Sequence, residues 1–276
     1  MFKRIIARLD VKNDTLVKGI NLEGLRNLGK PEEFAKKYYF DGIDEIHYQD
    51  VVASLYSRDS LIKVIDNTIK DIFVTVSVGG GIRNNKDIDQ ILRYGADKIS
   101  INSAAVRNPE ILKKAANVFG SSTISVNIET LKLNNKYEVF IDSGRQRTGL
   151  ELFSWIDKIQ KLGVGELIVT SISHEGKKNG FDYSLYKEIK SKTSVPIVAH
   201  GGAGSTDHIL KLFVECNVDA VSLASIMHYS YLDKNIKIKN EGKSVYLKNI
   251  KESDKSKFSL KNLKLNLKKN GIKIRI

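Results

Sequence analysis

Two carboxylates stand where this sequence could place an acid and a base. Asp10 ends the stretch RIIARLD, and Glu129 ends the stretch ISVNIE, 119 residues further along. Apolar and β-branched residues predict that both stretches are buried strands, so each carboxylate would lie at the carboxyl end of its strand. We therefore predict that Asp10 and Glu129 form an acid and base pair that works on the carbon chain of a substrate.

Glycine clusters follow two other predicted strands, in SVGGGI at 77–82 and AHGGAG at 199–204. Glycine lets the backbone approach a ligand closely, and the N–H groups of such loops bind anions. A serine-bearing helix start follows each next strand, where a helix N-terminus favours a phosphate. The residues predicted to bind phosphate are Gly80, Gly81, Asn102 and Ser103 in one half of the chain, and Thr170, Gly176, Gly201, Gly202, Ala224 and Ser225 in the other.

The elements that must position these residues are short β-branched runs alternating with amphipathic helical stretches. Strands are predicted at 4–9, 45–49, 75–78, 98–101, 124–128, 167–170, 196–199 and 220–223, and helices at 31–39, 60–68, 88–94, 109–118, 154–162, 184–191 and 206–214. This alternation is typical of a parallel α/β architecture, and a (β/α)8 TIM barrel takes about 250 residues.

An internal repeat favours the closed barrel over an open sheet. DGIDEI (41–46) is echoed by LGVGEL (162–167), and GADKISINSAAV (95–106) by NVDAVSLASIMH (217–228), 121 and 122 residues later. Two fused half-barrels, about 1–120 and 121–230, would repeat in this way. Asp10 and Glu129 would then face each other across the mouth, between two phosphate sites. This arrangement predicts a substrate with a phosphate at each end.

Four charged residues begin predicted strands and so mark the opposite, N-terminal end of the barrel: Arg4, Glu45, Lys98 and Glu166. Two interpretations stay open at this point. The four could be an ordinary charged rim at the barrel bottom. Their alternating signs could also form a salt-bridged ring that closes the central passage.

Composition narrows the function classes. The chain has 276 residues, 41% of them hydrophobic, and a net charge of +13 from 45 basic and 32 acidic residues. Cys216 is the only cysteine, which excludes an internal disulfide and a multi-cysteine zinc site and favours a cytoplasmic location. No run of eighteen apolar residues occurs, so we expect no membrane association, and the histidines show no metal-ligand spacing.

The positive charge is concentrated in residues 231–276, which hold fourteen basic and four acidic residues. This segment lacks the arginine and aromatic interleaving of a base-stacking surface, so we expect no nucleic-acid partner. We interpret it as a basic C-terminal extension of the 1–230 barrel, whose Val245, Tyr246 and Leu247 and whose helix at 260–267 pack on the body. An alternative is electrostatic docking of an acidic partner or an anionic substrate.

These motifs together resemble the cyclase subunit of imidazole glycerol phosphate synthase. The resemblance is carried by RIIARLDVKNDTLVKGIN, SVGGGI, GADKISINSAAV, GELIVTSI and VAHGGAGSTDH followed by SLASIMH, in order over residues 1 to about 230. It implies a duplicated half-barrel enzyme of histidine biosynthesis and a glutaminase partner bound at the N-terminal face. Ammonia from that partner would travel through the barrel to a bisphosphate ribulosyl nucleotide.

The resemblance also implies roles for single residues. Arg4, Glu45, Lys98 and Glu166 match the charged gate to the ammonia passage of this family. Lys18, in the mobile loop after the first strand, matches a residue that closes over the substrate. The products would be imidazole glycerol phosphate and an aminoimidazole carboxamide nucleotide, with no cofactor or metal required. We expect a heterodimer with the glutaminase.

Departures from the family pattern fall at the chemical centre. Glu129 replaces an Asp, Arg8 replaces a Cys, His200 replaces a Ser, and Ser173-His174-Glu175-Gly176 replaces Asp-Arg-Asp-Gly. A displacement of about 1 Å at a reacting centre can cost roughly a hundredfold in rate. Glu175 and His200 at these positions, and Asp50 at the end of the second strand, are candidate substrate contacts.

The altered centre leaves two alternatives open. The chain resembles paralogues from surface-polysaccharide pathways, which deliver ammonia to an amino-sugar or its nucleotide conjugate. It could also serve chiefly as a non-catalytic activator of its glutaminase, in which case the carboxylates at the mouth would be dispensable. The sequence alone does not decide the acceptor.

Overall fold

Eight parallel strands close into a barrel in the computed structural model, which describes residues 2–52, 59–235 and 258–276. The strand order is β10-β11-β12-β1-β4-β5-β6-β7, and pairing of β10 with β7 closes the ring. The predicted α/β TIM barrel is thus confirmed. The eight strands are β1 (Arg4–Lys12), β4 (Glu45–Asp50), β5 (Thr75–Gly79), β6 (Lys98–Ile101), β7 (Ile124–Leu133), β10 (Glu166–Ser171), β11 (Ile197–His200) and β12 (Ala220–Leu223).

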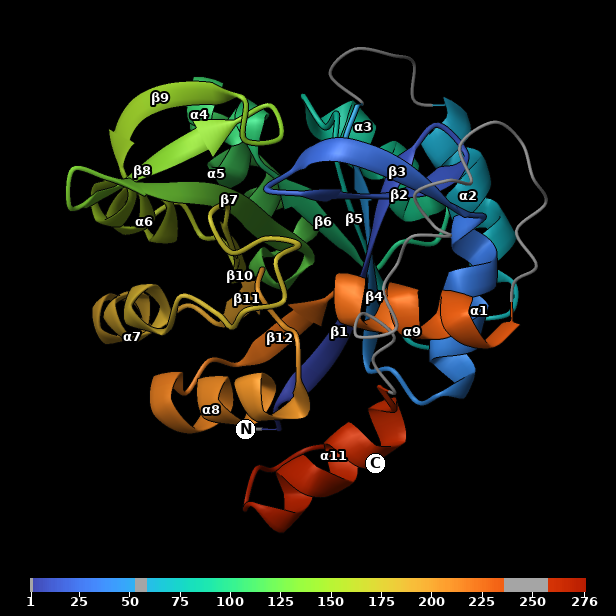
Figure 1. The fold of residues 1–276 in the computed structure, drawn as a ribbon. Helices are drawn as coiled ribbons and strands as arrows, with labels where there is room; N and C mark the ends of the chain where they lie inside the picture. Colours follow the sequence, from blue (N-terminus) through green and yellow to red (C-terminus); the bar gives the residue numbers. More distant parts are fainter. Residues whose placement is uncertain (1, 53–58, 236–257) are drawn as a thin grey trace.

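Helices form the outer layer around these strands (Figure 1). They are α1 (Pro31–Phe40), α2 (Asp59–Ile69), α3 (Asn85–Arg93), α4 (Ser103–Arg107), α5 (Glu110–Phe119), α6 (Leu152–Gln160), α7 (Tyr183–Lys192), α8 (Thr206–Cys216), α9 (Ser225–Asn235) and α11 (Leu260–Lys269), with a 3-10 turn at Ser121–Thr123. Side-chain caps fix the N-termini of two of these helices: Asn84 and Asp87 form a capping box at α3, and Ser205 caps α8. Among the described residues, no helix has the length and apolar character to cross a membrane.

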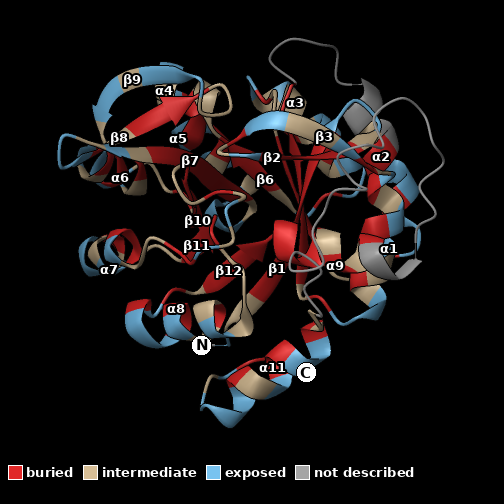
Figure 2. Cartoon of the chain, viewed as in Figure 1, coloured by how far each residue is buried: buried red, intermediate tan, exposed pale blue. Residues whose placement is uncertain are grey.

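Strand alternation decides which side chains reach the barrel interior. Along β1, Ile5, Ala7 and Leu9 are fully buried against the helices, whereas Arg4 and Arg8 point to the barrel axis and contact residues of strands across the interior. Figure 2 shows the strands of the barrel largely buried and the helices buried mainly on their inner sides. The segment RIIARLD therefore directs its charged residues and Ile6 inward and its other apolar residues outward.

Two antiparallel hairpins were absent from the sequence-based prediction. β2 (Thr15–Ile20) and β3 (Glu23–Gly29) follow β1, whereas β8 (Lys136–Ile141) and β9 (Gln146–Glu151) follow β7. β2 and β8 begin 121 residues apart, so the hairpins belong to the internal repeat. Each first turn carries asparagine with positive φ, at Asn13 and at Asn134, which is a hairpin signal that the sequence offered.

The hairpins explain where the predicted strands were too short. β1 and β7 extend beyond the predicted ends because each continues into a hairpin that rises over the same end of the barrel (Figure 1). The expectation that Lys18 lies in a mobile loop is wrong: Lys18 lies in β2 and is 1% exposed. A strand that folds back across the mouth can bury a lysine, which a free loop would leave in water.

α11 lies beside α8 and reaches the turn before β4 (Figure 1). The ammonium of its buried Lys264 donates to the Gly42 carbonyl at 2.7 Å and contacts Asp44 at 2.6 Å, and Lys3 pairs with Ile274 in a short β-bridge. α9, which follows β12, is the eighth outer helix and packs on Phe34 of α1 through His228 and Tyr231, so α11 is an additional helix at the N-terminal end of the barrel. Val245, Tyr246 and Leu247 lie outside the described residues.

Candidate active site

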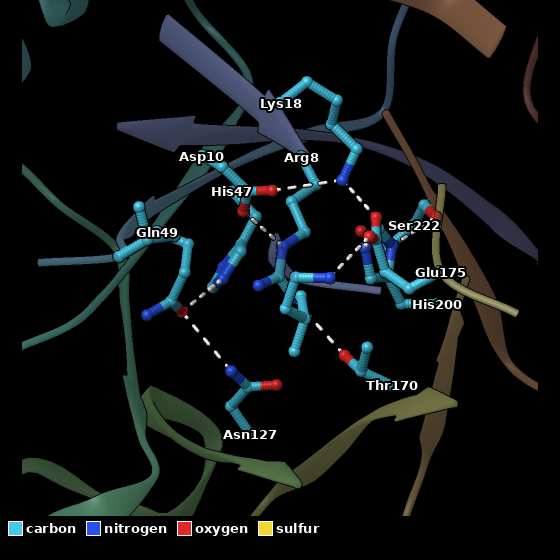
Figure 3. Close-up of polar contacts among 12 residues, drawn as sticks. Arg8, Asp10, Lys18, His47, Gln49, Asn127, Thr170, Glu175, His200 and Ser222 are labelled. Carbon is cyan, nitrogen blue, oxygen red and sulfur yellow. Dashed lines mark hydrogen bonds and ion pairs between the residues drawn. The ribbon is translucent and has the colours of Figure 1, made fainter. Parts of the chain in front are cut away.

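A buried cluster of four charged side chains occupies the centre of the barrel mouth. The Arg8 guanidinium donates to Asp10 at 2.8 Å, and the Lys18 ammonium lies 3.3 Å from the other Asp10 oxygen. Lys18 also forms an ion pair with Glu175. Figure 3 shows the Lys18 ammonium between the two carboxylates, with Arg8 beneath them. All four side chains are at least 96% buried, so each charge depends on its partners.

The cluster fixes Asp10 as a carboxylate. Burial by itself raises the pKa of Asp10, but the neighbouring Arg8 and Lys18 cations outweigh burial and hold that pKa well below its usual range. Burial by itself lowers the pKa of Lys18. The neighbouring Glu175 and Asp10 carboxylates outweigh burial, so the pKa of Lys18 is raised. Asp10 is therefore a permanent negative charge at neutral pH and a poor proton donor.

Glu129 lies in the opposite half of the barrel and has a different environment. Its carboxylate accepts a hydrogen bond from the Gly144 backbone N–H at 2.8 Å, and it is 4% exposed. Burial raises the pKa of Glu129 to about 7, although Arg8 opposes this rise. A carboxyl group with that pKa can give or take a proton near neutral pH. The two carboxylates predicted as a pair, Asp10 and Glu129, therefore differ in pKa and in their ability to transfer a proton.

The first predicted phosphate site forms a cavity beside Glu129. Gly80, Gly81, Asn102 and Ser103, which the sequence predicts to bind phosphate, line it. At Gly80, with φ +105°, a Cβ would come within 2.4 Å of the Asp50 carbonyl oxygen, so only glycine fits.

Cations that sequence analysis did not identify complete this first cavity. Arg83 and Arg107 also line it, and both follow the glycine and serine motifs closely enough to have been candidates. Asp142 from the turn between β8 and β9 contacts Arg107 at 2.6 Å, and its backbone N–H donates to the Ser103 hydroxyl at 3.0 Å. An anion that binds here would compete with Asp142 for Arg107.

The second predicted phosphate site is a smaller cavity, lined by Gly176, Gly201, Gly202, Ala224 and Ser225. At Gly202, with φ +106°, a Cβ would lie 2.0 Å from the Gly180 carbonyl oxygen. Lys178 lines this cavity as well and was not predicted. The two glycine loops therefore occupy matching places in the two halves.

A third cavity joins these two sites across the mouth. Its lining includes Asp10, Lys18 and Arg145, and it shares Glu129 with the first cavity and Glu175 with the second. An elongated ligand with an anion at each end would thus pass directly over the charged cluster. This shared lining is the geometric basis for treating the mouth as a single site.

Three further candidate residues, Thr170, Asp50 and His200, lie in different places relative to these cavities. Thr170 lines none of these cavities: its hydroxyl lies 3.5 Å from the Arg8 guanidinium, in the barrel interior. Asp50 lines the first cavity and accepts from the Val52 N–H at 2.9 Å. His200 lines the second cavity, and burial together with the Arg8 and Lys18 cations lowers the pKa of His200 well below its usual range.

The four charged residues at the opposite end of the barrel come together. Arg4 contacts Glu45 at 2.7 Å and also contacts Glu166, while Lys98 contacts the same two carboxylates at 3.1 and 3.5 Å. Burial raises the pKa of Glu45, Lys98 opposes this rise, and the nearby Glu166 charge adds to it. Of the two interpretations left open by the sequence, the geometry favours the salt-bridged ring.

Comparison with known proteins agrees with this geometry. The family model described as histidine biosynthesis protein matches residues 4–233. The imidazole glycerol phosphate synthase subunit HisF of Bacillus cereus (strain Q1) is 44% identical over 228 residues, which are 82% of this chain and 90% of that protein. The subunit of the same name from Legionella pneumophila is 44% identical over 205 residues, 74% of this chain and 97% of that protein. The resemblance seen in the motifs is confirmed.

The raised pKa of Glu129 predicts a specific pH dependence of stability. Between the ordinary pKa of 4.5 and the folded-state pKa of about 7, the folded protein keeps a proton that the unfolded chain has lost. The unfolding free energy of the wild type, minus that of Glu129→Gln, should therefore fall by about 3 kcal/mol as pH rises through this window. Denaturant unfolding at a series of pH values measures it.

The exposed Glu110, changed to Gln, is the matched control for this measurement. A wild-type minus Glu129→Gln difference that stays level or rises between these pH values would show that Glu129 is ionised in the folded protein. The assignment of Glu129 as a proton donor at neutral pH would then be wrong.

Proposed function

This chain belongs to the histidine biosynthesis protein family, and we propose on that premise that it acts as the cyclase subunit of imidazole glycerol phosphate synthase. The relatives at 44% identity carry that name over most of their length. The observation that supports this function best is the continuous mouth, in which two glycine-lined cavities flank Asp10 and Glu129. The activity is that of an ammonia-dependent cyclase and lyase.

The substrate proposed for the mouth is a phosphoribulosyl formimino carboxamide nucleotide. Its two phosphates would occupy the two outer cavities, where Arg83, Arg107 and Lys178 supply positive charge. Its ribulosyl ketone would then lie over the third cavity, between the two carboxylates. Ammonia adds to this ketone, and elimination releases imidazole glycerol phosphate and the aminoimidazole carboxamide nucleotide.

The different environments of Glu129 and Asp10 favour a different catalytic role for each carboxylate. Glu129, with a pKa of about 7, would donate a proton to the ketone oxygen as ammonia adds and later remove one during elimination. Asp10 stays ionised, so it would stabilise the positive charge that develops on the incoming nitrogen. Lys18 would leave Glu175 and pair with the substrate, which the hairpin then covers.

The N-terminal face is the proposed docking surface for a glutaminase partner. Phe2, Phe40 and Phe73 are 64%, 71% and 80% exposed, and each lies shortly before the start of a barrel strand. Phe40 and Phe73 both contact the ring of Tyr39, which makes a continuous aromatic patch at this end. Exposed aromatic clusters mark protein interfaces. The ring of Arg4, Glu45, Lys98 and Glu166 opens on the same face, as a gate for ammonia would require.

Arg8 favours a second candidate function. This cation is 1% exposed and lies under the third cavity, where it pairs with Asp10 and contacts Thr170. The site therefore offers a different charge to the middle of the ligand than the family pattern would. An ammonia-channelling enzyme that aminates a different acceptor, such as an amino-sugar conjugate of surface-polysaccharide synthesis, fits this change.

One assay separates the candidates. The purified protein is given an ammonium salt and the ribulosyl nucleotide, and the aminoimidazole product is measured. We expect turnover, and we expect Asp10→Asn to lower kcat by about a hundredfold or more because the fixed charge is lost. The same change at the exposed Asp14 should leave kcat unaltered.

Absence of turnover in the wild type would contradict the cyclase function. If the protein nevertheless stimulates glutamine hydrolysis by a co-encoded glutaminase, the second acceptor or a purely activating role would explain it. Ammonia-dependent amination of an amino-sugar conjugate would then distinguish these two.

The proposed docking surface can be tested by its effect on glutaminase binding. Phe73→Asp places a charge in the exposed aromatic patch and should weaken binding of the glutaminase at least tenfold, or about 1.4 kcal/mol. Isothermal titration calorimetry gives the affinities. Leu150→Asp, at an exposed leucine in the hairpin at the other end of the barrel, is the matched control. Equal affinities for both variants would place the interface elsewhere.

A further inference from the structure

His200 and Ser222 form the inner end of the second cavity, here called its floor. They are paired neighbours at the ends of β11 and β12, both line the cavity, and each is 2% exposed. Figure 3 shows them grouped with Glu175 on the same side of Arg8. The floor therefore consists of an imidazole and a hydroxyl that water does not reach freely.

Hydrogen bonding fixes the proton of the His200 ring. Its Nδ1 lies 2.9 Å from the backbone carbonyl oxygen of Ser222, which can only accept, so Nδ1 carries the proton. Burial together with the Arg8 and Lys18 cations lowers the pKa of His200 well below its usual range, so the ring holds a single proton. His200 Nε2 is therefore a hydrogen-bond acceptor.

Both atoms that the floor turns to the cavity lack partners. His200 Nε2 and Ser222 Oγ make no hydrogen bond to any described residue. The nearest charged atom to Nε2 is a Glu175 carboxylate oxygen at 3.8 Å, which is itself an acceptor and cannot satisfy a lone pair. A buried polar atom without a partner is costly, so the floor favours a guest that brings a hydrogen-bond donor.

A phosphate group fits the outer part of the second cavity and not its floor. The backbone of Gly201 and Gly202 and the start of α9 at Ser225 follow the floor residues by one to three positions, at about 3.3 Å per residue along a strand. At the floor itself, an anionic oxygen would face the Nε2 lone pair and the Glu175 carboxylate. The spacing suits a phosphate ester whose hydroxyl lies one or two carbons beyond the ester carbon.

The other half of the barrel repeats only part of this floor. Ser100 is paired with Gly79 as Ser222 is paired with His200, and Ser100 Oγ is likewise without a partner in the described part of the chain. At Gly79, however, a Cβ would lie 2.5 Å from the side-chain oxygen of Gln49. The first cavity thus has the serine and no room for the imidazole.

We propose that His200 Nε2 and Ser222 Oγ bind a hydroxyl group of the ligand, next to the phosphate that occupies the second cavity. The hydroxyl donates to Nε2 and accepts from the Ser222 hydroxyl, so one group satisfies both atoms. The inference deepens the proposed function and rests on it for the phosphate. It makes His200 a specificity residue, because a ligand without a donor at this place leaves Nε2 unpaired.

Two phosphate esters of similar size test the floor by calorimetry. sn-Glycerol 3-phosphate carries hydroxyls on both carbons beyond its ester carbon, and n-propyl phosphate carries none. The wild type should bind the glycerol ester about tenfold more tightly, the effect of pairing two buried groups. His200→Phe and Ser222→Ala should each reduce this preference.

Ser125→Ala is the matched control for Ser222→Ala. Ser125 is equally buried on a barrel strand, but its hydroxyl is already engaged, since it donates to the Ile99 carbonyl at 2.9 Å. This variant should keep the full preference for the glycerol ester. Equal affinities of the wild type for the two esters, no binding of the glycerol ester, or the same loss in both serine variants would overturn the inference.

A ¹⁵N NMR spectrum of the histidine rings gives a readout at the second cavity in the wild-type protein. The chain has five histidines, and His200→Phe identifies the His200 signals. Its Nε2 should resonate as an unprotonated nitrogen and move upfield with the glycerol ester, because it then accepts a hydrogen bond, and should not move with the propyl ester. A protonated Nε2, or an equal response to both esters, would contradict the assignment.

Neither measurement uses the cyclase reaction. Failure of the wild type to convert the ribulosyl nucleotide would therefore remove the proposed function, while the hydroxyl site stands or falls on the two esters.

Discussion

The structure depends on burying four charges at the mouth of a barrel without leaving any of them unpaired. Arg8 and Lys18 neutralise Asp10 and Glu175, and the contacts join β1, the β2–β3 hairpin and the loop after β10. A buried ion without its partner costs several kcal/mol. The hairpin must therefore fold across the mouth for the cluster to form, and substrate must replace some of these contacts when it binds.

The internal repeat gives the two halves of the barrel matching strand positions, but different residues occupy those positions. Asp10 and Glu129 occupy matching strand ends, but the residue two positions before Asp10 is Arg8 and the residue two positions before Glu129 is Asn127. One half thus places a cation under its carboxylate, and the other half places an amide. Arg8 and Lys18 together hold the pKa of Asp10 low, whereas burial raises the pKa of Glu129 to about 7.

The sequence predicted the parts of this molecule that local patterns encode. The eight barrel strands, the glycine loops and the four ring residues follow from periodicity and the repeat. Lys18 was placed in a loop because its pairing with Glu175, 157 residues away, depends on how the hairpin crosses the mouth. The unequal ionisation of Asp10 and Glu129 likewise depends on burial and on Arg8. Strand alternation predicts that the Arg8 side chain faces inward, but it does not predict the contact of Arg8 with Asp10.

The most direct test of the account is a titration of the carboxyl groups followed by NMR in protein labelled with ¹³C at aspartate and glutamate side chains. The Glu129 signal, assigned with Glu129→Gln, should titrate near pH 7. The Asp10 signal should show no protonation while the protein remains folded. If both signals instead titrate together near the ordinary value of about 4, Arg8 and the barrel do not separate the two carboxylates, and the account is contradicted.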